Sequence, residues 1–366
     1  MPDKAYLVLA DGTIFEGYSF GAKGEVVGET VFTTGMTGYL ETLTDKSYYG
    51  QIITQTFPLI GNYGVIPADF ESAAPAAKGY IVKEWCQDPS NFRSEGDLDA
   101  FLREQGVVGL YGIDTRKLTK IIRESGVMNG KITHIKPSSV PSDVTDYVIK
   151  DAVGACSTKA EYVVQPTVAT SGYRVALLDF GLKENIVRSL TTRGIEVTVF
   201  PHDTTAARIR EFAPDGIMLT NGPGDPRAEE NAPIVAMLKE LITSKIPIFG
   251  ICFGNQLLAL AHGFKIEKLK YGHRGANQPS KDLTSGKTFV TCQNHGYAVV
   301  SSSIDPAVAE EWFVNVNDGT NEGVKYKNAP IYSVQFHPES CGGPQDTSFL
   351  FDNFVANMEG YKNAVK

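Results

Sequence analysis

A single cysteine, Cys252, stands between two glycines in the sequence GICFGNQLLALAHG, residues 250–263. The preceding IPIFGI has the pattern of a short buried strand, and QLLALAHG has the apolar spacing of a helix that ends at Gly263. Cys252 is therefore predicted on a tight strand-to-helix turn, like the serine of a G-x-S-x-G nucleophile elbow. There the helix N-terminus favours the thiolate, and the N–H of Phe253 faces an oxyanion. Without a base nearby, the same cysteine could equally be a small core residue.

The candidate base lies in SVQFHPES, residues 333–340, where an alternating strand ends just before His337. Glu339 follows two positions later and can orient the imidazole, while Pro338 stiffens the turn between them. Cys252, His337 and Glu339 thus form a candidate catalytic triad. The other histidines that lack such a neighbour are expected to be exposed or structural: His134, His202, His262 and His273.

A second glycine-bearing loop, LTNGPGDP at 219–226, follows the predicted strand GIMLT and contains Gly222 and Gly224. Such a loop can bring backbone N–H groups close to a ligand and complete an oxyanion hole with Phe253. An ordinary turn is an equal alternative. The loop is not a dinucleotide fingerprint, because Arg227 stands where the third glycine should be.

Neither a phosphate-binding loop nor a metal site is predicted. SGKT at 285–288 imitates the end of a phosphate loop, but Lys281 stands where its first glycine is needed. No acidic or His/Cys cluster has metal-ligand spacing. The cysteines contain no CxxC pair and indicate neither a disulfide framework nor a zinc cluster: Cys86, Cys156, Cys252, Cys292 and Cys341. No cofactor or metal is therefore expected in this chain.

Composition limits the possible partners. The chain has 366 residues, 42% of them hydrophobic, which is enough for two domains with ordinary cores. Its formal net charge of −8 argues against nucleic acid or an anionic membrane as a partner. The apolar opening AYLVLA is shorter than a signal-peptide core, and no segment approaches the ~20 apolar residues of a membrane span. A cytoplasmic protein that binds small polar molecules or other proteins is expected.

The two halves of the chain differ in pattern. Residues 1–150 contain short strand-like runs, with a helix predicted at RKLTKIIRES. Residues 151–172 lack a sustained period and are predicted to be a linker. From 173 to 366 strands alternate with helices, which predicts a doubly wound, largely parallel α/β sheet with ligands at the carboxyl ends of its strands. Additional antiparallel strands and a closing helix are expected from KTFVTCQN, YAVVSS, EEWFVNV, PIYSVQFH and DTSFLFDNFVANMEG.

Four motifs in the order NGPGDP, GICFGNQ, QNHGYAV and FHPE resemble the class I (triad) glutamine amidotransferases, which have a flavodoxin-like fold. The resemblance implies that Cys252 attacks the side-chain amide of L-glutamine and forms a glutamyl thioester. His337 then acts as general base and later acid, and Glu339 orients it. The glutamine pocket that the resemblance implies comprises Ser47, Gly222, Gly224, Phe253, Gln256, Asn294, Gly296 and Tyr297.

The N-terminal half narrows the resemblance. Residues 31–65 and GIDTRKLTKIIRESG at 112–126 are similar to the small-subunit family of carbamoyl-phosphate synthase, which implies an N-terminal swivelling β/β/α domain that contacts a partner. Because the chain has no recognisable ATP site, the resemblance implies a large synthetase subunit that carries ATP and Mg²⁺. That subunit would receive ammonia through a tunnel. The sequence departs from the usual family residues at Lys46, Phe253, Asn255 and Tyr297.

Two other functions use the same residues. A stand-alone glutamine or γ-glutamyl hydrolase would need the same triad and would be fully active without a partner. A scaffold that only binds and regulates a synthetase would need no triad, so the complete set of Cys252, His337 and Glu339 argues against it. Activity measured with and without a partner distinguishes these functions.

Overall fold

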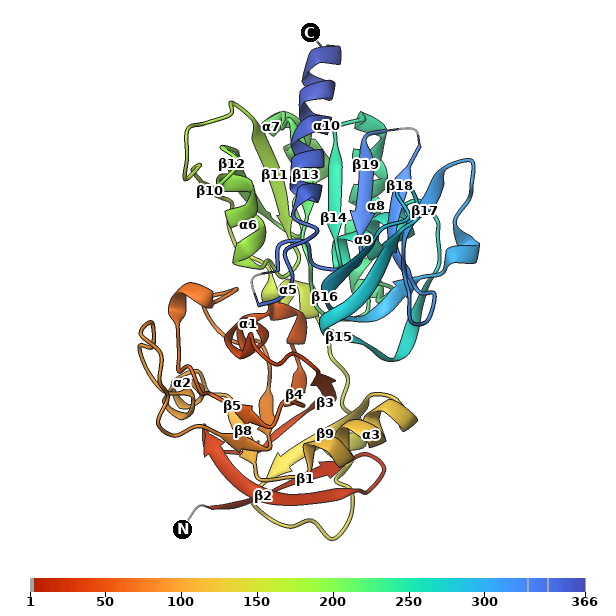
Figure 1. The fold of residues 1–366 in the computed structure, drawn as a ribbon. Coiled ribbons are helices and arrows are strands. Elements are labelled where there is room, and N and C mark those ends of the chain that lie inside the picture. The colour runs from red at the N-terminus through yellow and green to blue at the C-terminus, as the bar shows by residue number, and fades with distance from the viewer. Residues whose placement is uncertain (1–2, 328, 341, 366) are drawn as a thin grey trace. The chain divides into compact units, whose positions relative to one another are not determined.

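The structure, a computed structural model, describes residues 3–327, 329–340 and 342–365 and divides the chain into two compact units. The first unit is Met1–Lys150 and the second is Asp151–Lys366 (Figure 1). Cys341 lies outside the described residues. The four described cysteines are all free: Cys86, Cys156, Cys252 and Cys292.

The first unit is built around a closed β-barrel with the strand order β1-β2-β8-β6-β4-β3-β9. Its strands are β1 Lys4–Leu9, β2 Ile14–Gly21, β3 Val26–Thr33, β4 Gln51–Gln55, β6 Gly79–Val82, β8 Val108–Tyr111 and β9 Met128–Thr133. Strands β1 and β2 form the predicted hairpin, because Gly12 adopts the positive φ of +87° that its turn requires. Alternate inward side chains, such as Leu7 and Leu9, fill the barrel core.

Short helices complete the first unit, with a small sheet of β5 Leu59–Ile60 and β7 Glu84–Trp85 beside them. The helices are α1 Tyr39–Thr44, α2 Leu98–Glu104, α3 Thr115–Ser125 and α4 Ser142–Thr145. Helix α3 is the helix predicted at RKLTKIIRES. The Asp114 side chain caps it by accepting from the Lys117 N–H, and it buries Leu118 and Ile122.

The second unit contains a mixed sheet with the order β10-β12-β11-β13-β14-β19-β18-β17-β15-β16. Strands β12, β11, β13, β14 and β19 are parallel to their neighbours in that run, and the remaining strands are added in antiparallel fashion. The strands are β10 Tyr162–Val164, β11 Arg174–Asp179, β12 Glu196–Pro201, β13 Gly216–Leu219, β14 Ile248–Ile251, β15 Ile266–Asp282, β16 Thr288–Val299, β17 Ala309–Asn315, β18 Asn321–Tyr326 and β19 Ile331–Val334.

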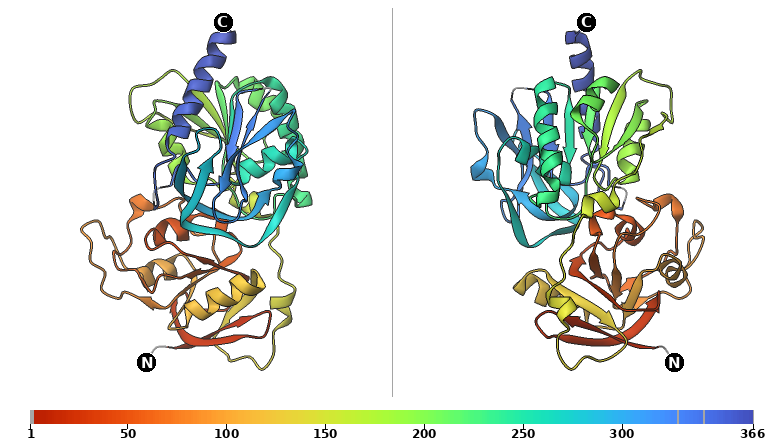
Figure 2. Two further views of the ribbon diagram at one scale, coloured as in Figure 1. Left: turned by 45° about the vertical axis from the view of Figure 1, so that its right-hand side comes forward. Right: turned by 180° about the vertical axis from the view of Figure 1, so that it is seen from behind.

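Helices cover both faces of the parallel strands, as Figures 1 and 2 show. They are α5 Ala152–Cys156, α6 Glu184–Thr191, α7 Ala206–Phe212, α8 Ala232–Leu241, α9 Phe253–Ala261 and α10 Phe349–Val365. On β11, Ala176 and Leu178 pack with α7, α8 and α9, while Val175 and Leu177 pack with α6 and α10. The predicted fold class, a doubly wound α/β domain after a strand-rich domain, is confirmed.

Two details differ from the sequence predictions. PIYSVQFH was expected to be antiparallel, but β19 is parallel to β14 and therefore belongs to the central sheet. The predicted linker at 151–172 contains α5 and β10, and β10 pairs with the edge strand β12. Both elements are too short to give a recognisable period, which is why the sequence did not indicate them.

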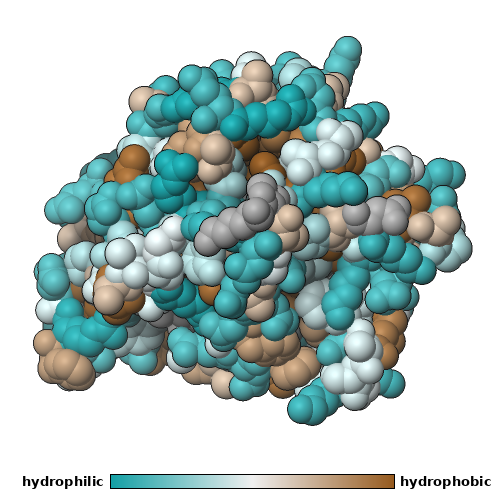
Figure 3. Space-filling model, turned by 90° about the horizontal axis from the view of Figure 1, so that it is seen from above, coloured by the Kyte–Doolittle hydropathy of each residue, from teal (hydrophilic) through white to brown (hydrophobic). Residues whose placement is uncertain are grey.

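The described helices include none that is long and apolar enough to cross a membrane. The face of the molecule seen in Figure 3 is mostly hydrophilic, and its apolar residues are scattered among polar ones. Scattered apolar residues are normal on a protein surface and do not mark an interaction site by themselves.

The closing helix α10 packs closely on the sheet at Gly216. A Cβ at Gly216 would lie 2.7 Å from both Phe354 Cζ and Met358 Sδ, whereas a Cβ at Gly360 of the same helix would meet no atom within 4 Å. We expect Gly216→Ala to lower the free energy of unfolding by about 1–3 kcal/mol through overpacking. The control Gly360→Ala should raise it by up to about 1 kcal/mol. Urea unfolding measures both, and equal midpoints for the two variants would contradict this packing.

Candidate active site

Cys252 lies at the turn between β14 and α9, where the backbone bends sharply. Its φ of 54° and ψ of −101° are unusual for a residue with a side chain. Such a conformation costs on the order of 1–3 kcal/mol and persists only where the surrounding structure holds it. The residue is 2% exposed and directly precedes the first helical residue, Phe253. The turn is thus the strand-to-helix nucleophile position that the sequence predicted.

The two glycines beside this turn serve close packing, and the sharp bend is at Cys252 itself. Neither Gly250 nor Gly254 has a positive φ. A Cβ at Gly254 would lie 2.5 Å from the carbonyl oxygen of Leu219, and one at Gly250 would lie 2.8 Å from Leu258 Cδ1. Without side chains at these two positions, α9 can approach β13 and β14 closely enough to hold the turn.

Strand β19 places His337 at the carboxyl ends of the parallel strands, where Cys252 also lies. It is the parallel neighbour of β14, with Ile251 opposite Val334, and the Cys252 N–H donates to the Val334 carbonyl at 2.8 Å. Three residues after Val334, the His337 N–H donates to the Cys292 carbonyl on β16 at 2.9 Å. The carboxyl end of β14, the segment after β19 and the interior of β16 are therefore joined by backbone hydrogen bonds beside the candidate nucleophile and base.

The imidazole of His337 is held by Glu339. Its Nδ1 donates to Glu339 Oε1 at 2.7 Å, and both side chains are completely buried. Among the described residues, His337 Nε2 has no hydrogen-bond partner, so this nitrogen can take part in proton transfer. The buried ammonium of Lys183 lies 3.9 Å from the same Glu339 oxygen. Lys183 lies after the carboxyl end of β11. The sequence predicted that this end of the strand lies at the site, but it did not indicate Lys183 as a functional residue.

Glu339 and His337 stabilise each other's charges, whereas the ammonium of Lys183 opposes the charge of His337 and lowers its pKa. Burial by itself would lower the pKa of His337, but Glu339 and Cys252 raise that pKa to about 10. Burial would raise the pKa of Glu339, but His337 and Lys183 hold it below its usual range. At neutral pH the pair is therefore an imidazolium and a carboxylate, and His337 can give a proton to a leaving group.

The N–H of Phe253, next to Cys252, is available to an oxyanion. As the first residue of α9, Phe253 has no acceptor for its N–H within the helix. The ring of Phe253 packs in the core, and its centroid lies 6.1 Å from that of the Phe180 ring. Only the backbone of Phe253 therefore faces the turn. The loop after β13 is fixed by Asn221, which donates to the Gly181 carbonyl at 2.8 Å and accepts from the Lys183 N–H at 3.2 Å. This arrangement suits attack on a carbonyl carbon followed by acyl transfer.

Comparison with known proteins agrees with this chemistry. The family described as carbamoyl-phosphate synthase small chain, CPSase domain, matches residues 7–132, and glutamine amidotransferase class-I matches residues 176–357. A carbamoyl phosphate synthase small chain from Clostridium perfringens is 49% identical over 356 residues, covering 96% of this chain and 99% of that protein. The chain belongs to the carbamoyl-phosphate synthase small-chain family.

Other members of the family have nearly the same sequence identity to this chain and also match it over almost its whole length. Small chains from Bacillus cereus and Fusobacterium nucleatum are each 48% identical, covering 98% and 96% of this chain and 97% and 98% of theirs. The family and the enzyme class predicted from the sequence, glutamine-hydrolysing carbamoyl-phosphate synthase, are confirmed. The individual site residues stay predictions, and the structure shows where they lie.

Polar contacts join four of the predicted site residues at or near the turn. The Cys252 sulfur lies 3.7 Å from the carbonyl oxygen of Asn294 on β16. Gln256 on α9 donates to the Tyr297 carbonyl at 2.8 Å. The other predicted pocket residues of this unit are Gly222 and Gly224 in the loop after β13, Phe253 on α9 and Gly296 on β16.

The remaining predicted pocket residue belongs to the first unit. Ser47 is buried in a 3-10 turn at Lys46–Tyr48, where its N–H donates to the Asp45 carboxylate at 2.9 Å. Its part in glutamine binding stays a prediction.

Asn255, which departs from the usual family residue, belongs to a buried polar network. Its amide accepts from the Ser333 hydroxyl at 2.7 Å and donates to Gln335 Oε1 at 3.1 Å. Gln256 donates to the same Gln335 oxygen at 3.1 Å. The network thus ties α9 to the segment before His337. Sequence reasoning missed Gln335, because a buried glutamine in a strand gives no pattern by itself.

Replacing Glu339 should impair the base without unfolding the site. We expect Glu339→Gln to lower kcat for glutamine hydrolysis by about 10²- to 10⁴-fold, since the variant loses the charge that orients and stabilises the imidazolium. The pKa of His337 should fall, because burial would then dominate. Nuclear magnetic resonance of labelled histidine measures that pKa, and the exposed Glu310→Gln on β17 is the control.

The same variant gives a pH test. A raised pKa stabilises the folded state below the ordinary value of 6.5, and this contribution is lost as the pH rises toward about 10. The difference in unfolding free energy between wild type and Glu339→Gln should therefore shrink over that interval. A difference that stays constant with pH would show that His337 is not charged by Glu339.

The Asn255 network gives a stability test. Asn255→Ala removes partners from the buried Ser333 hydroxyl and the Gln335 amide, so we expect the free energy of unfolding to fall by about 1–3 kcal/mol. The exposed Asn353→Ala on α10 is a matched control and should change it by no more than about 0.5 kcal/mol. Chemical denaturation measures both variants. Equal stability of the two would mean that the network contributes nothing.

Proposed function

We propose that this chain is the glutaminase subunit of carbamoyl-phosphate synthase, with Cys252 as nucleophile, His337 as proton carrier and Glu339 as its orienter. The single observation that supports this best is the buried His337–Glu339 pair beside a cysteine on a strand-to-helix turn. Family membership selects glutamine as the substrate, because the matching C-terminal domain is a class-I glutamine amidotransferase.

In the first half of the reaction, the Cys252 sulfur attacks the side-chain amide carbon of glutamine. The oxyanion that forms accepts hydrogen bonds from the backbone N–H groups of Phe253 and Gly222. His337, protonated at neutral pH, gives its proton to the amide nitrogen. The carbon–nitrogen bond then breaks, which releases ammonia and leaves a glutamyl thioester on Cys252.

In the second half, water attacks the thioester carbonyl while His337 accepts a proton from it. The carbon–sulfur bond breaks, glutamate leaves, and Cys252 and His337 return to their starting state. Lys183 stabilises the Glu339 carboxylate throughout, since its ammonium lies 3.9 Å away in a buried environment. The same imidazole thus carries the proton throughout: as base it takes the proton of Cys252, as acid it gives that proton to the leaving ammonia, and as base again it accepts one from water.

Substrate binding uses groups without formal charge. The Gln256 Nε2 donates to protein acceptors, so we assign its amide oxygen to the glutamine ammonium. Backbone groups of Gly224, Asn294 and Gly296 line the same end of the sheet and suit a zwitterion with a polar side chain.

The ammonia released here serves a second active site. Free ammonia in neutral water is mostly protonated and is then no nucleophile, so delivery through a protected tunnel keeps it reactive. We assign ATP and Mg²⁺ to a large synthetase subunit, which makes carbamoyl phosphate from bicarbonate and this ammonia. The name shared by the relatives, a small chain of the synthase, supports such a partner. A cytoplasmic location stays a prediction.

Ammonia release from glutamine tests the proposal. The chain is assayed alone and then with a large synthetase subunit, ATP and bicarbonate. We expect a low basal rate that rises on mixing, with carbamoyl phosphate as product. Cys252→Ser should lower turnover by at least about 10³-fold, whereas Cys86→Ser, at a partly exposed cysteine of the first unit, should leave it unchanged.

Each alternative gives a different result. A high rate that the partner does not change would identify an independent glutamine hydrolase. An unchanged rate in Cys252→Ser would remove Cys252 from the reaction. Acid quenching with labelled glutamine tests the thioester directly, because protein-bound label should appear in the wild type and be absent from Cys252→Ser.

A further inference from the structure

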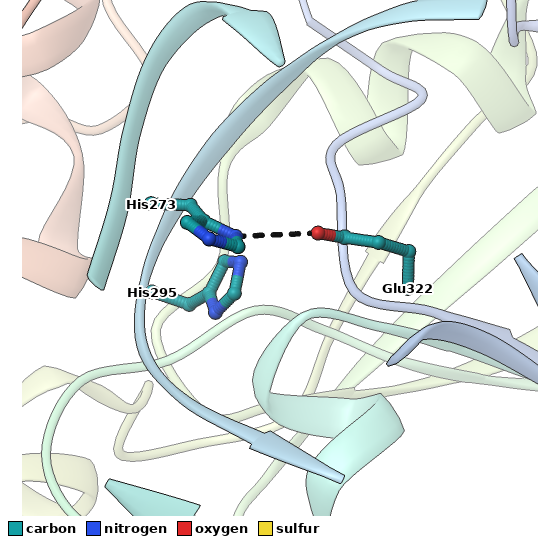
Figure 4. Close-up of side chains that lie close together, drawn as sticks. All are labelled: His273, His295 and Glu322. Carbon is teal, nitrogen blue, oxygen red and sulfur yellow. Dashed lines mark ion pairs between the residues drawn. The ribbon is translucent and has the colours of Figure 1, made fainter. Parts of the chain in front are cut away.

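Three buried side chains outside the proposed triad converge in the second unit. His273 on β15 and His295 on β16 are opposite each other in the strand register, and Glu322 lies at the start of β18. One ligand-type atom from each lies within 4.8 Å of the other two. Figure 4 shows the three side chains directed toward one another. Their exposed fractions are 7%, 5% and 0%.

The two polar contacts of the His295 ring leave the lone pair of Nε2 without a hydrogen-bond donor. Its Nδ1 lies 2.8 Å from the Tyr297 carbonyl, which can only accept, so Nδ1 carries the proton. Its Nε2 then has a lone pair and lies 3.1 Å from Gln293 Oε1, which is also an acceptor.

Turning the Gln293 amide round would give His295 Nε2 a donor, but it would place the amide oxygen against the Thr291 hydroxyl. The Gln293 Nε2 donates to the Thr291 hydroxyl at 3.1 Å, and that hydroxyl already donates to the Gln278 carbonyl at 2.9 Å. The hydroxyl of Thr291 can therefore only accept from Gln293, which fixes the amide with its oxygen toward His295. Two acceptors at this distance repel unless a cation lies beside both.

His273 repeats the pattern. Its Nε2 donates to Asp318 Oδ2 at 2.8 Å, while its Nδ1 lies 3.3 Å from Glu322 Oε1. That contact lacks hydrogen-bond geometry, and among the described residues neither His273 Nδ1 nor Glu322 Oε2 has a hydrogen-bond partner. His273 Nδ1, His295 Nε2 and the Glu322 carboxylate thus face one another in a buried space.

We propose that His273, His295 and Glu322 bind a divalent transition-metal ion, with Zn²⁺ as the best fit. Ligand atoms about 2.0–2.1 Å from a tetrahedral ion lie about 3.3 Å apart, and His273 Nδ1 and Glu322 Oε1 are separated by 3.3 Å. Two imidazoles and a carboxylate form a common zinc ligand set and disfavour Mg²⁺ and Ca²⁺. The Gln293 amide oxygen lies next to the fourth position.

The groups that hydrogen-bond to the three proposed ligands are of the kind that surrounds metal sites in proteins. Asp318 accepts from the distal nitrogen of His273, and the Tyr297 carbonyl accepts from that of His295, so each ring presents its other nitrogen to the ion. The Asn315 amide donates to Glu322 at 3.1 Å. The carboxylates of Asp318 and Glu322 together balance the two positive charges of the ion.

The consequence is structural. The ion would join β15, β16 and β18 beside the β16 segment that carries Asn294 and Gly296, and so fix one wall of the proposed pocket. Spacing along the sequence does not indicate this site, because its ligands are far apart in the chain and come from three strands. The sequence expectation of no metal stays a prediction, and this proposal differs from it.

Zinc binding tests the proposal on protein stripped with a chelator. The parent protein is the Cys252→Ser variant, so that the thiol cannot act as a ligand. We expect one equivalent of Zn²⁺ by competition with an indicator dye, a rise in thermal midpoint, and visible bands of four-coordinate Co²⁺. Mg²⁺ should produce neither the midpoint shift nor competition.

Variants locate the ion. Glu322→Gln and His273→Asn should each weaken Zn²⁺ binding by more than about 100-fold, and Asp318→Asn by about 10- to 100-fold. His134→Gln, at a histidine of the first unit, is the matched control and should bind as the parent does. Absence of binding in the parent, equal binding in Glu322→Gln, or only six-coordinate Co²⁺ would overturn the proposal. The parent measurements decide even if a variant fails to fold.

Discussion

The backbone conformation of Cys252 is the constraint on which the active site depends. A positive φ at a residue with a side chain is unfavourable, so neighbouring elements must hold the turn in place. The Cys252 N–H donates to β19, the Gly254 N–H donates to the Thr220 carbonyl at 3.0 Å, and Gly254 lets α9 approach β13. The buried ring of Phe253 fixes the start of the helix. The strain therefore presents the sulfur at the edge of the sheet.

The buried charges of the triad explain how one imidazole can be both acid and base. Glu339 keeps its charge in the protein interior because His337 and Lys183 lie beside it. In turn, that carboxylate stabilises the imidazolium against the cost of burial. Removing Glu339 would leave two buried cations without a counter-charge, so both His337 and Lys183 depend on this carboxylate.

Local patterns in the sequence predicted the features that depend on neighbouring residues alone. The strand-to-helix turn at Cys252, helix α3 and the alternation of strands and helices all follow from periodicity and glycine placement. Strand direction was harder: β19 is parallel because it pairs with β14, and its own residues do not determine its direction. The ion-pairing partners of His273 were missed because Asp318 and Glu322 are distant in sequence.

The parallel pairing of β14 and β19 has a consequence for evolution. Cys252 and His337 come from the ends of adjacent strands, and the long chain segment between them leaves and returns to the same edge of the sheet. That segment forms the outlying antiparallel strands, which include a wall of the proposed pocket. Substitutions and insertions in it can alter which molecule is admitted while nucleophile and base keep their spacing. New specificities can therefore arise in this fold without a new catalytic apparatus.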